Sequence, residues 1–234
     1  MSTEDNRFWL GTGLGVLGLV PPIVECLKRD FQLAALYSLV LLLMLAWFFF
    51  SLRSGRGPQY ATLSMKKTLE IVKADGSIAR MRREQHIRVN YGQLSEIWCR
   101  NIVADGCIQN LLIDNNPPDD QKRMGCLLSI CKRFGTPLFK GQETTIVWTY
   151  ELRNSFPART EALEHDVKQA TRYLELTIVL PVSRPCRGAS LHELIAGDPD
   201  KLLPNPVIDM RGTVIKAILK HPEKGRTIRL TWEW

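Results

Sequence analysis

The pattern of hydrophobic and polar positions changes once along this chain. The first part contains two long apolar runs, 8–24 and 31–52, separated by a short polar segment. Further along, apolar positions alternate with polar ones, which is the period of a half-buried strand. Apolar runs of about 20 residues are long enough to cross a bilayer as helices. The pattern therefore predicts a transmembrane helical hairpin over 1–52, a hinge over 53–59 and a β-rich domain over 60–234.

The two apolar runs differ in composition. Residues 31–52 carry no charge and are rich in leucine and phenylalanine, whereas 8–24 contains several glycines and ends at two prolines that must bend or stop a helix. Gly11 and Gly15 lie four positions apart, so a helix would present both on one face, where another helix can approach closely. This face predicts either packing against the second helix of the same chain or self-association of several chains.

Basic residues near the two runs predict their orientation. The connecting loop holds Lys28 and Arg29, whereas the outer flanks together hold more basic residues, namely Arg7, Arg53, Arg56, Lys66 and Lys67. The positive-inside rule then places both termini in the cytoplasm. The cysteines of 60–234 form no short paired framework, which agrees with a reducing compartment.

Turn signals divide the region after residue 60. Asp75-Gly76 lies between two alternating segments and predicts a β-hairpin, because glycine adopts positive φ without steric cost. The same dipeptide at Asp105-Gly106 predicts a second hairpin, formed by residues 97–113. Both predictions place antiparallel strands next to each other in the sheet.

The remaining elements are assigned from composition. Residues that are β-branched or aromatic gather in three further predicted strands, at 144–152, 173–180 and 227–234. The acidic, proline-containing segment 115–123 is a predicted loop, and single helical turns are predicted within 160–170 and 190–195. The predicted class is mainly β, either an antiparallel β-barrel or a β-sandwich, and the sequence does not distinguish them.

A search for catalytic or metal-binding motifs finds none. The four histidines are scattered, and Cys126 and Cys131 do not have the usual zinc spacing. His165 has acidic neighbours at Glu164 and Asp166, which a solvated helical face explains better than an acid–base cluster. The sequence predicts a protein that is not an enzyme and holds no metal and no cofactor.

Basic residues exceed acidic ones, with 31 Lys and Arg against 24 Asp and Glu and a net charge of +7 at pH 7. Alternation places Arg80, Arg82 and Arg88 on one face of a predicted strand, where guanidinium groups can bind phosphates in bidentate fashion. A solvated strand face, or attraction to anionic lipid headgroups, explains the same pattern. No nucleic-acid-binding motif accompanies these residues, so neither DNA nor RNA is an expected partner.

Two spanning helices, no enzyme motif and a β-rich domain with a basic face resemble the two-transmembrane, β-strand-rich effectors of bacterial cyclic-oligonucleotide antiphage signalling (CBASS). The resemblance lies in this layout. It implies a multi-pass protein of the bacterial inner membrane whose cytoplasmic β domain binds a cyclic oligonucleotide. It further implies that ligand binding causes homo-oligomerisation and disruption of the lipid bilayer.

The resemblance suggests which residues would contact the ligand. Arg80, Arg82 and Arg88 would bind its phosphates, and an aromatic side chain such as Trp148 or Tyr150 would contribute to the site. On this hypothesis, reversing the charge of Arg80 and Arg82 abolishes the ligand response.

A second hypothesis comes from a different class of protein. The domain could be a membrane-tethered scaffold that binds another protein and has no small-molecule ligand. Its final strand, which carries Trp232 and Trp234, could pair with the edge of a partner's sheet. Core packing explains the same two tryptophans.

Overall fold

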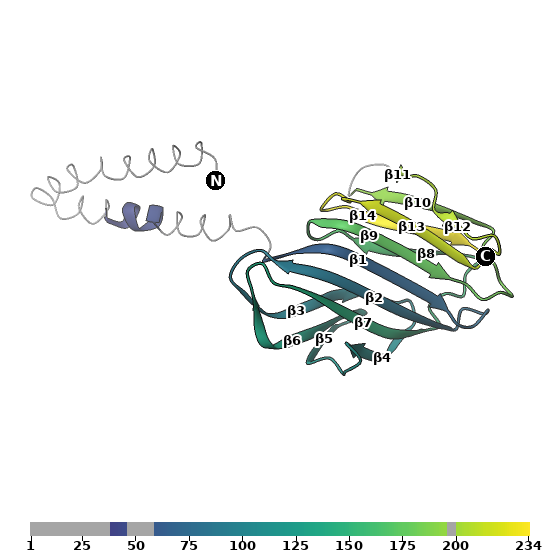
Figure 1. Ribbon diagram of the computed structural model, residues 1–234, viewed down its shortest axis with the longest axis horizontal. Helices are drawn as coiled ribbons and strands as arrows, with labels where there is room; N and C mark the ends of the chain where they lie inside the picture. The colour runs from purple at the N-terminus through teal and green to yellow at the C-terminus, as the bar shows by residue number, and fades with distance from the viewer. Residues whose placement is uncertain (1–37, 46–58, 196–199) are drawn as a thin grey trace, which may run out of the picture. The chain divides into compact units, whose positions relative to one another are not determined.

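The structure is a computed structural model that describes residues 38–45, 59–195 and 200–234. The chain divides into two units, Met1–Gly57 and Pro58–Trp234, which are described separately. In the first unit, the described residues 38–45 are helical (Figure 1).

The predicted transmembrane hairpin is contradicted. Among the residues that the structure describes, no helix is long and apolar enough to cross a membrane. The predicted location as a multi-pass protein of the bacterial inner membrane depended on that hairpin and is corrected with it. The run 8–24, with Gly11 and Gly15, lies outside the described residues.

The second unit is built from strands. Their bounds in chain order are β1 Tyr60–Ile71, β2 Ile78–Val89, β3 Gln93–Ile102, β4 Cys107–Ile113, β5 Asp120–Met124, β6 Leu127–Phe139, β7 Glu143–Arg153, β8 Thr160–Asp166, β9 Thr171–Val179, β10 Gly188–Leu194, β11 Lys201–Leu202, β12 Val207–Ile208, β13 Val214–Lys220 and β14 Thr227–Glu233. The long strands β1 and β2 run through the middle of the unit (Figure 1). The prediction that residues 60–234 are mainly β therefore describes this unit correctly.

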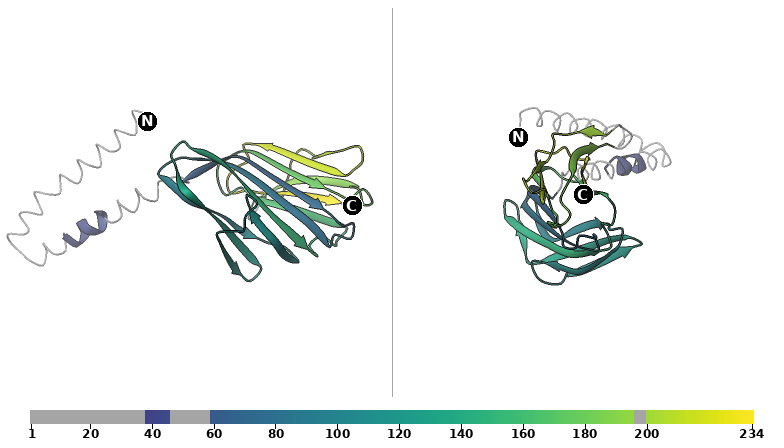
Figure 2. Two further views of the ribbon diagram at one scale, coloured as in Figure 1. Left: turned by 60° about the horizontal axis from the view of Figure 1, so that its bottom comes forward. Right: turned by 90° about the vertical axis from the view of Figure 1, so that its right-hand side faces the viewer.

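The strands form three sheets. The largest has seven strands in the order β12-β13-β9-β1-β2-β7-β4, and the others have the orders β11-β10-β14-β8 and β3-β6-β5. Figure 2 shows the same sheets from two further directions. Each sheet ends in strands with a single neighbour, and β1 runs parallel to β9. The predicted closed barrel is thus corrected to open sheets, and the predicted antiparallel pairing to one that includes the parallel pair of β1 and β9.

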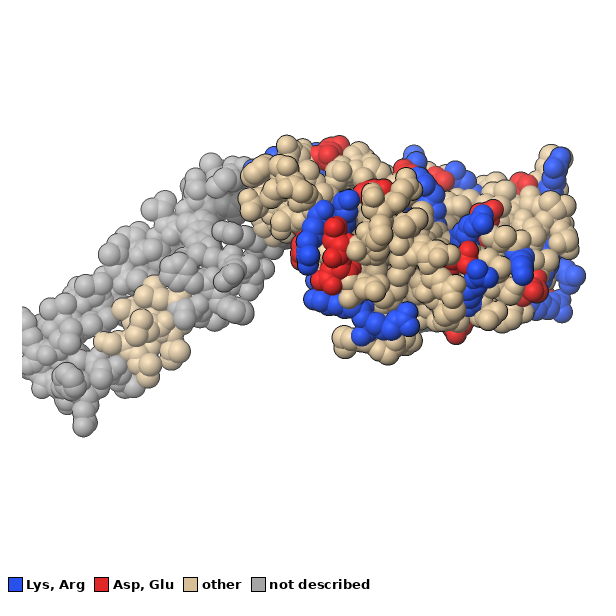
Figure 3. Space-filling model, turned by 90° about the horizontal axis from the view of Figure 1, so that it is seen from below, with Lys and Arg blue, Asp and Glu red and all other residues tan. Residues whose placement is uncertain are grey.

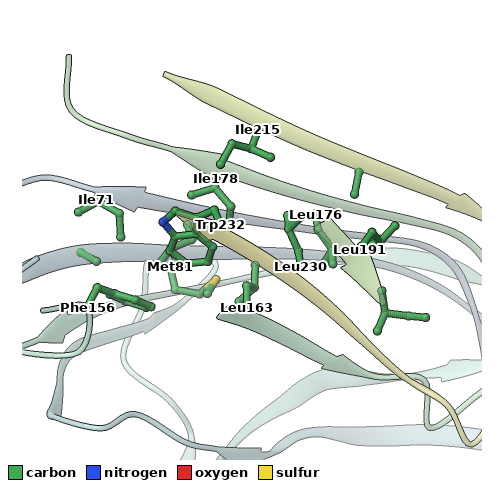
Figure 4. Close-up of a cluster of buried hydrophobic side chains, with 14 of the residues drawn as sticks. Ile71, Met81, Phe156, Leu163, Leu176, Ile178, Leu191, Ile215, Leu230 and Trp232 are labelled. Atoms are coloured by element: carbon green, nitrogen blue, oxygen red, sulfur yellow. The ribbon is translucent and has the colours of Figure 1, made fainter. Parts of the chain in front are cut away.

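Two hydrophobic clusters lie between the seven-stranded sheet and the two smaller sheets. The first packs β1, β9 and β13 against β8, β10 and β14, and includes Leu176, Leu230 and Trp232 (Figure 4). The second packs β2 and β7 against β3 and β6, and includes Ile87 and Trp148. Alternate residues of each strand supply these side chains, which is why a period of two dominates the sequence.

The first predicted hairpin is confirmed, and the second is wrong. β1 pairs with β2 around Gly76, whose φ is +73° and where a Cβ would lie 1.6 Å from the carbonyl oxygen of Phe156. β3 pairs instead with β6, and β4 with β7, so Asp105-Gly106 connects two different sheets. At Gly106 a Cβ would lie 1.7 Å from the carbonyl oxygen of Arg153. Close backbone packing, and not a hairpin turn, requires that glycine.

The predictions for the remaining elements are confirmed in part. The strands at 144–152, 173–180 and 227–234 are confirmed as β7, β9 and β14. The predicted loop 115–123 contains the start of β5, and the two predicted helical turns are β8 and β10. Both of these strands pair with β14, so long-range pairing decides their conformation and local sequence does not.

Candidate functional site

A cavity of about 840 Å³ lies between the two hydrophobic clusters. Its floor is the inner face of β1, β2 and β7, and its walls are β3 and β8. β3 and β8 are each the last strand of their sheet, so the walls are two sheet edges. Cavities of roughly 300–1,000 Å³ are typical of small-molecule sites.

Alternation along β2 places one arginine on this floor. Ala79, Met81, Ile87 and Val89 are buried, and residues of the same parity point toward the smaller sheets. Arg83 belongs to this set and lines the cavity, together with the buried Gln85. A charged side chain thus replaces an apolar one in the middle of the inner face.

A second cation stands directly opposite on the neighbouring strand. Lys67 of β1 is the register partner of Arg83 and also lines the cavity. Like charges directly opposite each other destabilise an antiparallel pair. Within the described part of the chain, neither side chain has a carboxylate within ion-pair distance. The two residues concentrate positive charge without a counter-ion among the described residues, and we call them the Lys67–Arg83 pair.

Neutral groups hold the guanidinium of Arg83 in place. Its Nη1 donates to Cys99 Sγ of β3 at 2.9 Å, and its Nη2 donates to Gln85 Oε1 at 2.9 Å. Gln85 Nε2 in turn donates to Thr62 Oγ1 at 3.2 Å. Arg83 Nε is buried and has no partner among the described residues. One donor of the guanidinium is therefore left without an acceptor among the described residues.

The acidic residues of β8 do not neutralise the pair. Lys67 Nζ donates to the backbone carbonyl of Glu164 at 2.9 Å, not to its carboxylate. That carboxylate accepts from Arg229 Nε at 2.7 Å. Asp166 accepts from Thr227 Oγ1 at 2.9 Å and pairs with Lys168 at 3.7 Å. Both carboxylates are engaged by other residues, so the positive charge of the pair remains directed at the cavity.

The pair changes the protonation of its neighbours. Burial, followed by the charge of Arg83, lowers the pKa of Lys67 to about 8. His165 of β8 is 5% exposed, and burial together with Lys67 and Arg83 lowers its pKa well below the usual value. Burial raises the pKa of Tyr150, so its hydroxyl stays protonated at neutral pH. Near pH 7 the site thus combines two cations with a neutral imidazole and a neutral phenol.

The three arginines predicted from sequence lie on the other face of β2. Arg80 pairs with Glu70 at 3.9 Å, and Arg82 with Glu84 at 3.3 Å. Arg88 is the register partner of Glu143. Figure 3 shows acidic residues beside basic ones across one face of the second unit. The structure brings these arginines onto one face, as predicted, but not into the cavity.

The two predicted aromatic residues lie on β7 and point inward. Tyr150 lines the cavity floor. Trp148 is fully buried in the second hydrophobic cluster, and its indole Nε1 has no partner among the described residues. Five residues were predicted to bind a ligand, and one of them, Tyr150, lines this cavity.

Lys67, Arg83 and His165 were missed by the sequence analysis. The sequence signal for them is a polar residue at one of the alternate positions of a strand that are otherwise apolar. Lys67 lies between Met65 and Leu69, both buried, in the alternation of β1. His165 was assigned to a solvated helical face, whereas in β8 it points inward.

Comparison with known proteins does not identify the family. No family model matches the chain, and no curated protein matches it. An M1 zinc metallopeptidase from Deinococcus radiodurans aligns with 74% of this chain and 42% of its own, at 8% identity and a TM-score of 0.42. Leukotriene A4 hydrolase from Saccharomyces cerevisiae aligns with 74% and 29%, at 10% identity and a TM-score of 0.43. This chain spans less than half the length of both proteins, and similarity this weak carries no argument about function.

The described residues also contain no group of three or more His, Cys, Asp or Glu side chains that could hold a metal ion. The cavity instead presents hydrogen-bond donors. Charge-assisted hydrogen bonds from guanidinium and ammonium groups to carboxylates and phosphates are the strongest in proteins. The arrangement is therefore suited to binding an anion.

Proposed function

We propose that the second unit is a binding module that holds a small phosphorylated ligand over the Lys67–Arg83 pair. The observation that carries the proposal is the absence of a carboxylate partner for these two opposed cations within the described residues. A phosphate between them would relieve their repulsion and accept charge-assisted hydrogen bonds from the two cations.

The size and lining of the cavity support a ligand larger than a single phosphate. Its volume of about 840 Å³ lies near the upper end of the range for small-molecule sites. The apolar and aromatic side chains of Met81 and Tyr150 lie beside the cations on the floor. A cyclic oligonucleotide, which the resemblance implies, belongs to the proposed ligand class. Membrane disruption depended on the transmembrane hairpin and is not part of the proposal.

Thermal melting of the purified full-length chain tests this function. The panel contains inorganic phosphate, cyclic di- and trinucleotides and, as the uncharged control, a nucleoside. A ligand at 100 times its Kd stabilises by about 2.7 kcal/mol, which raises the Tm of a chain of this size by roughly 5–10 °C. We expect at least one phosphorylated compound to produce such a shift and the nucleoside to produce none. A cooperative melt that no phosphorylated compound moves would contradict the proposal.

A second candidate function is binding of an extended peptide. The terminal strand β14 cannot act as the edge, because it lies between β10 and β8 and buries Trp232 and Trp234. The observation in favour of peptide binding is that the exposed edges of β3 and β8 both border the cavity. This candidate predicts that an acidic peptide protects backbone amides of β8 from hydrogen exchange. If phosphorylated compounds raise the Tm and the acidic peptide does not protect the amides of β8, peptide binding is excluded.

A further inference from the structure

The amine of Lys67 is placed differently from that of its neighbour Lys66. Lys66 lies on the outer face of β1, where its ammonium pairs with Glu84 at 3.9 Å. Lys67 lies on the inner face, between the buried Met65 and Leu69, and lines the cavity. Two adjacent lysines of one strand thus have different surroundings: Lys66 is exposed and ion-paired, whereas Lys67 is half-buried at the cavity.

The groups around Lys67 disfavour its protonated form. Arg83 of β2 stands directly opposite, and the strand β8 above it contributes the uncharged His165. Lys168 adds a further positive charge, while Asp166 and Cys99 act in the opposite direction. Burial and the two cations prevail, and the pKa of Lys67 falls to about 8 from the ordinary value of 10.5.

A partly buried lysine beside another cation is an arrangement that makes an amine nucleophilic, because a useful fraction of the amine is unprotonated near neutral pH. At pH 8 about half of an amine with a pKa near 8 is neutral, against less than about 1% of an ordinary lysine. The hydrogen bond from Lys67 Nζ to the carbonyl of Glu164 holds the nitrogen at the wall of the cavity, so its lone pair can face a bound molecule.

We propose that Lys67 is a covalent attachment site that forms a Schiff base with aldehydes bearing an anionic group. The neutral amine attacks the carbonyl carbon, a carbon–nitrogen double bond replaces the carbon–oxygen double bond, and the oxygen leaves as water with the two amine hydrogens. Arg83 binds the anionic group of the aldehyde. The preference for an anion rests on the proposed function, whereas the reactivity of the amine does not.

Reductive trapping on the full-length chain tests the amine. The folded protein is treated at pH 8 with glycolaldehyde, which is uncharged, or glyoxylate, which carries a carboxylate, in the presence of cyanoborohydride. The reductant delivers hydride to the imine carbon and water supplies the proton to nitrogen, so each attachment becomes a stable secondary amine. Peptide mass spectrometry then compares the labelling rates of Lys67 and Lys66.

We expect Lys67 to be labelled at least about tenfold faster than Lys66 with either aldehyde, and the advantage to disappear when the chain is unfolded in urea. The labelling rate of Lys67 should reach half its maximum near pH 8. Equal rates for Lys67 and Lys66 with both aldehydes in the folded protein would overturn the proposal.

Two substitutions separate this inference from the proposed function. Lys67→Arg retains a positive charge but removes the nucleophile, so trapping at this position is lost. Arg83→Gln retains the nucleophile and should abolish the preference for glyoxylate over glycolaldehyde. If glycolaldehyde labels Lys67 rapidly but no phosphorylated compound raises the Tm, the nucleophile stands and the proposed function fails. If such a compound raises the Tm while Lys67 and Lys66 label equally, the function stands and the nucleophile fails.

Discussion

The two faces of β2 place arginines in opposite circumstances. On the outer face, Arg80 and Arg82 are exposed and each contacts a carboxylate, Glu70 and Glu84. On the inner face, Arg83 is half-buried, stands opposite Lys67 and has neutral hydrogen-bond partners. Exposed ion pairs are screened by solvent, whereas a half-buried cation without a counter-ion retains a strong field. The number of arginines on a strand is therefore a weaker guide to an anion site than the partners of each one.

The same comparison extends to β1. Lys66 lies outside with a carboxylate, and Lys67 lies inside opposite an arginine. We expect the inner pair to reduce the stability of the domain, because both cations are partly buried and neither has a counter-ion among the described residues. Binding sites are often maintained against stability in this way. The contrast can be tested by changing matched residues on the two faces.

The largest expected difference is between Arg83→Gln and Arg82→Gln. Removing the charge of Arg83 deletes a half-buried donor set aimed at the ligand, so we expect affinity for a phosphorylated ligand to fall roughly 100-fold. Arg82→Gln removes an exposed charge and should change affinity by less than about threefold. Isothermal titration calorimetry with the compound that gives the largest Tm shift measures both. Equal losses in the two variants would remove the distinction between the faces.

The next effect concerns stability. Lys67→Met removes a poorly solvated charge opposite Arg83 and should raise the free energy of unfolding at pH 7 by about 1–2 kcal/mol. The matched change Lys66→Met removes an exposed ion pair and should alter that free energy by at most about 0.5 kcal/mol. Urea unfolding of the full-length variants provides the comparison. If Lys67→Met is the less stable of the two, the positive charge at Lys67 is not a cost to the fold.

The sequence predicted the strands better than their partners. Alternation and the Asp75-Gly76 turn located β1 and β2, and the apolar parity of Ile228 to Trp234 located the final strand. It could not show that β3 pairs with β6, because that pairing depends on contacts between distant residues. Hydropathy also favoured a transmembrane hairpin, whereas the described residues contain no helix that is long and apolar enough to cross a membrane.

The site was predictable only in part. Parity placed Arg80, Arg82 and Arg88 on one face correctly, and Tyr150 reaches the cavity. The register of β1 against β2, which brings Lys67 opposite Arg83, follows from the length of the turn, because the pairing is unbroken from Ile71 and Ala79 to Ser64 and His86. The available signal for the site was a charged residue at a position where the alternation of the strand otherwise places apolar residues.

A smaller effect is expected from pH. The pKa of Lys67 is about 8 in the folded protein and lies near its ordinary 10.5 in the unfolded chain. Between these values the unfolded chain binds more protons, so stability rises with pH. For one such group the gain between pH 7 and pH 9 is about 1 kcal/mol. The comparison of wild type with Lys67→Met isolates this contribution, and parallel pH profiles for the two proteins would contradict it.

The smallest effect on binding is expected from reversing two charges on the outer face. The sequence-based hypothesis holds that Arg80→Glu combined with Arg82→Glu abolishes the ligand response. The inner-face site predicts instead that affinity changes by less than about threefold, because both side chains point away from the cavity. Stability should fall by about 1 kcal/mol, since Arg80→Glu places a carboxylate opposite Glu70. Calorimetry on this double variant decides between the faces. Retained binding locates the anion at Lys67 and Arg83, whereas loss of binding in a variant that still melts cooperatively would return the site to the outer face.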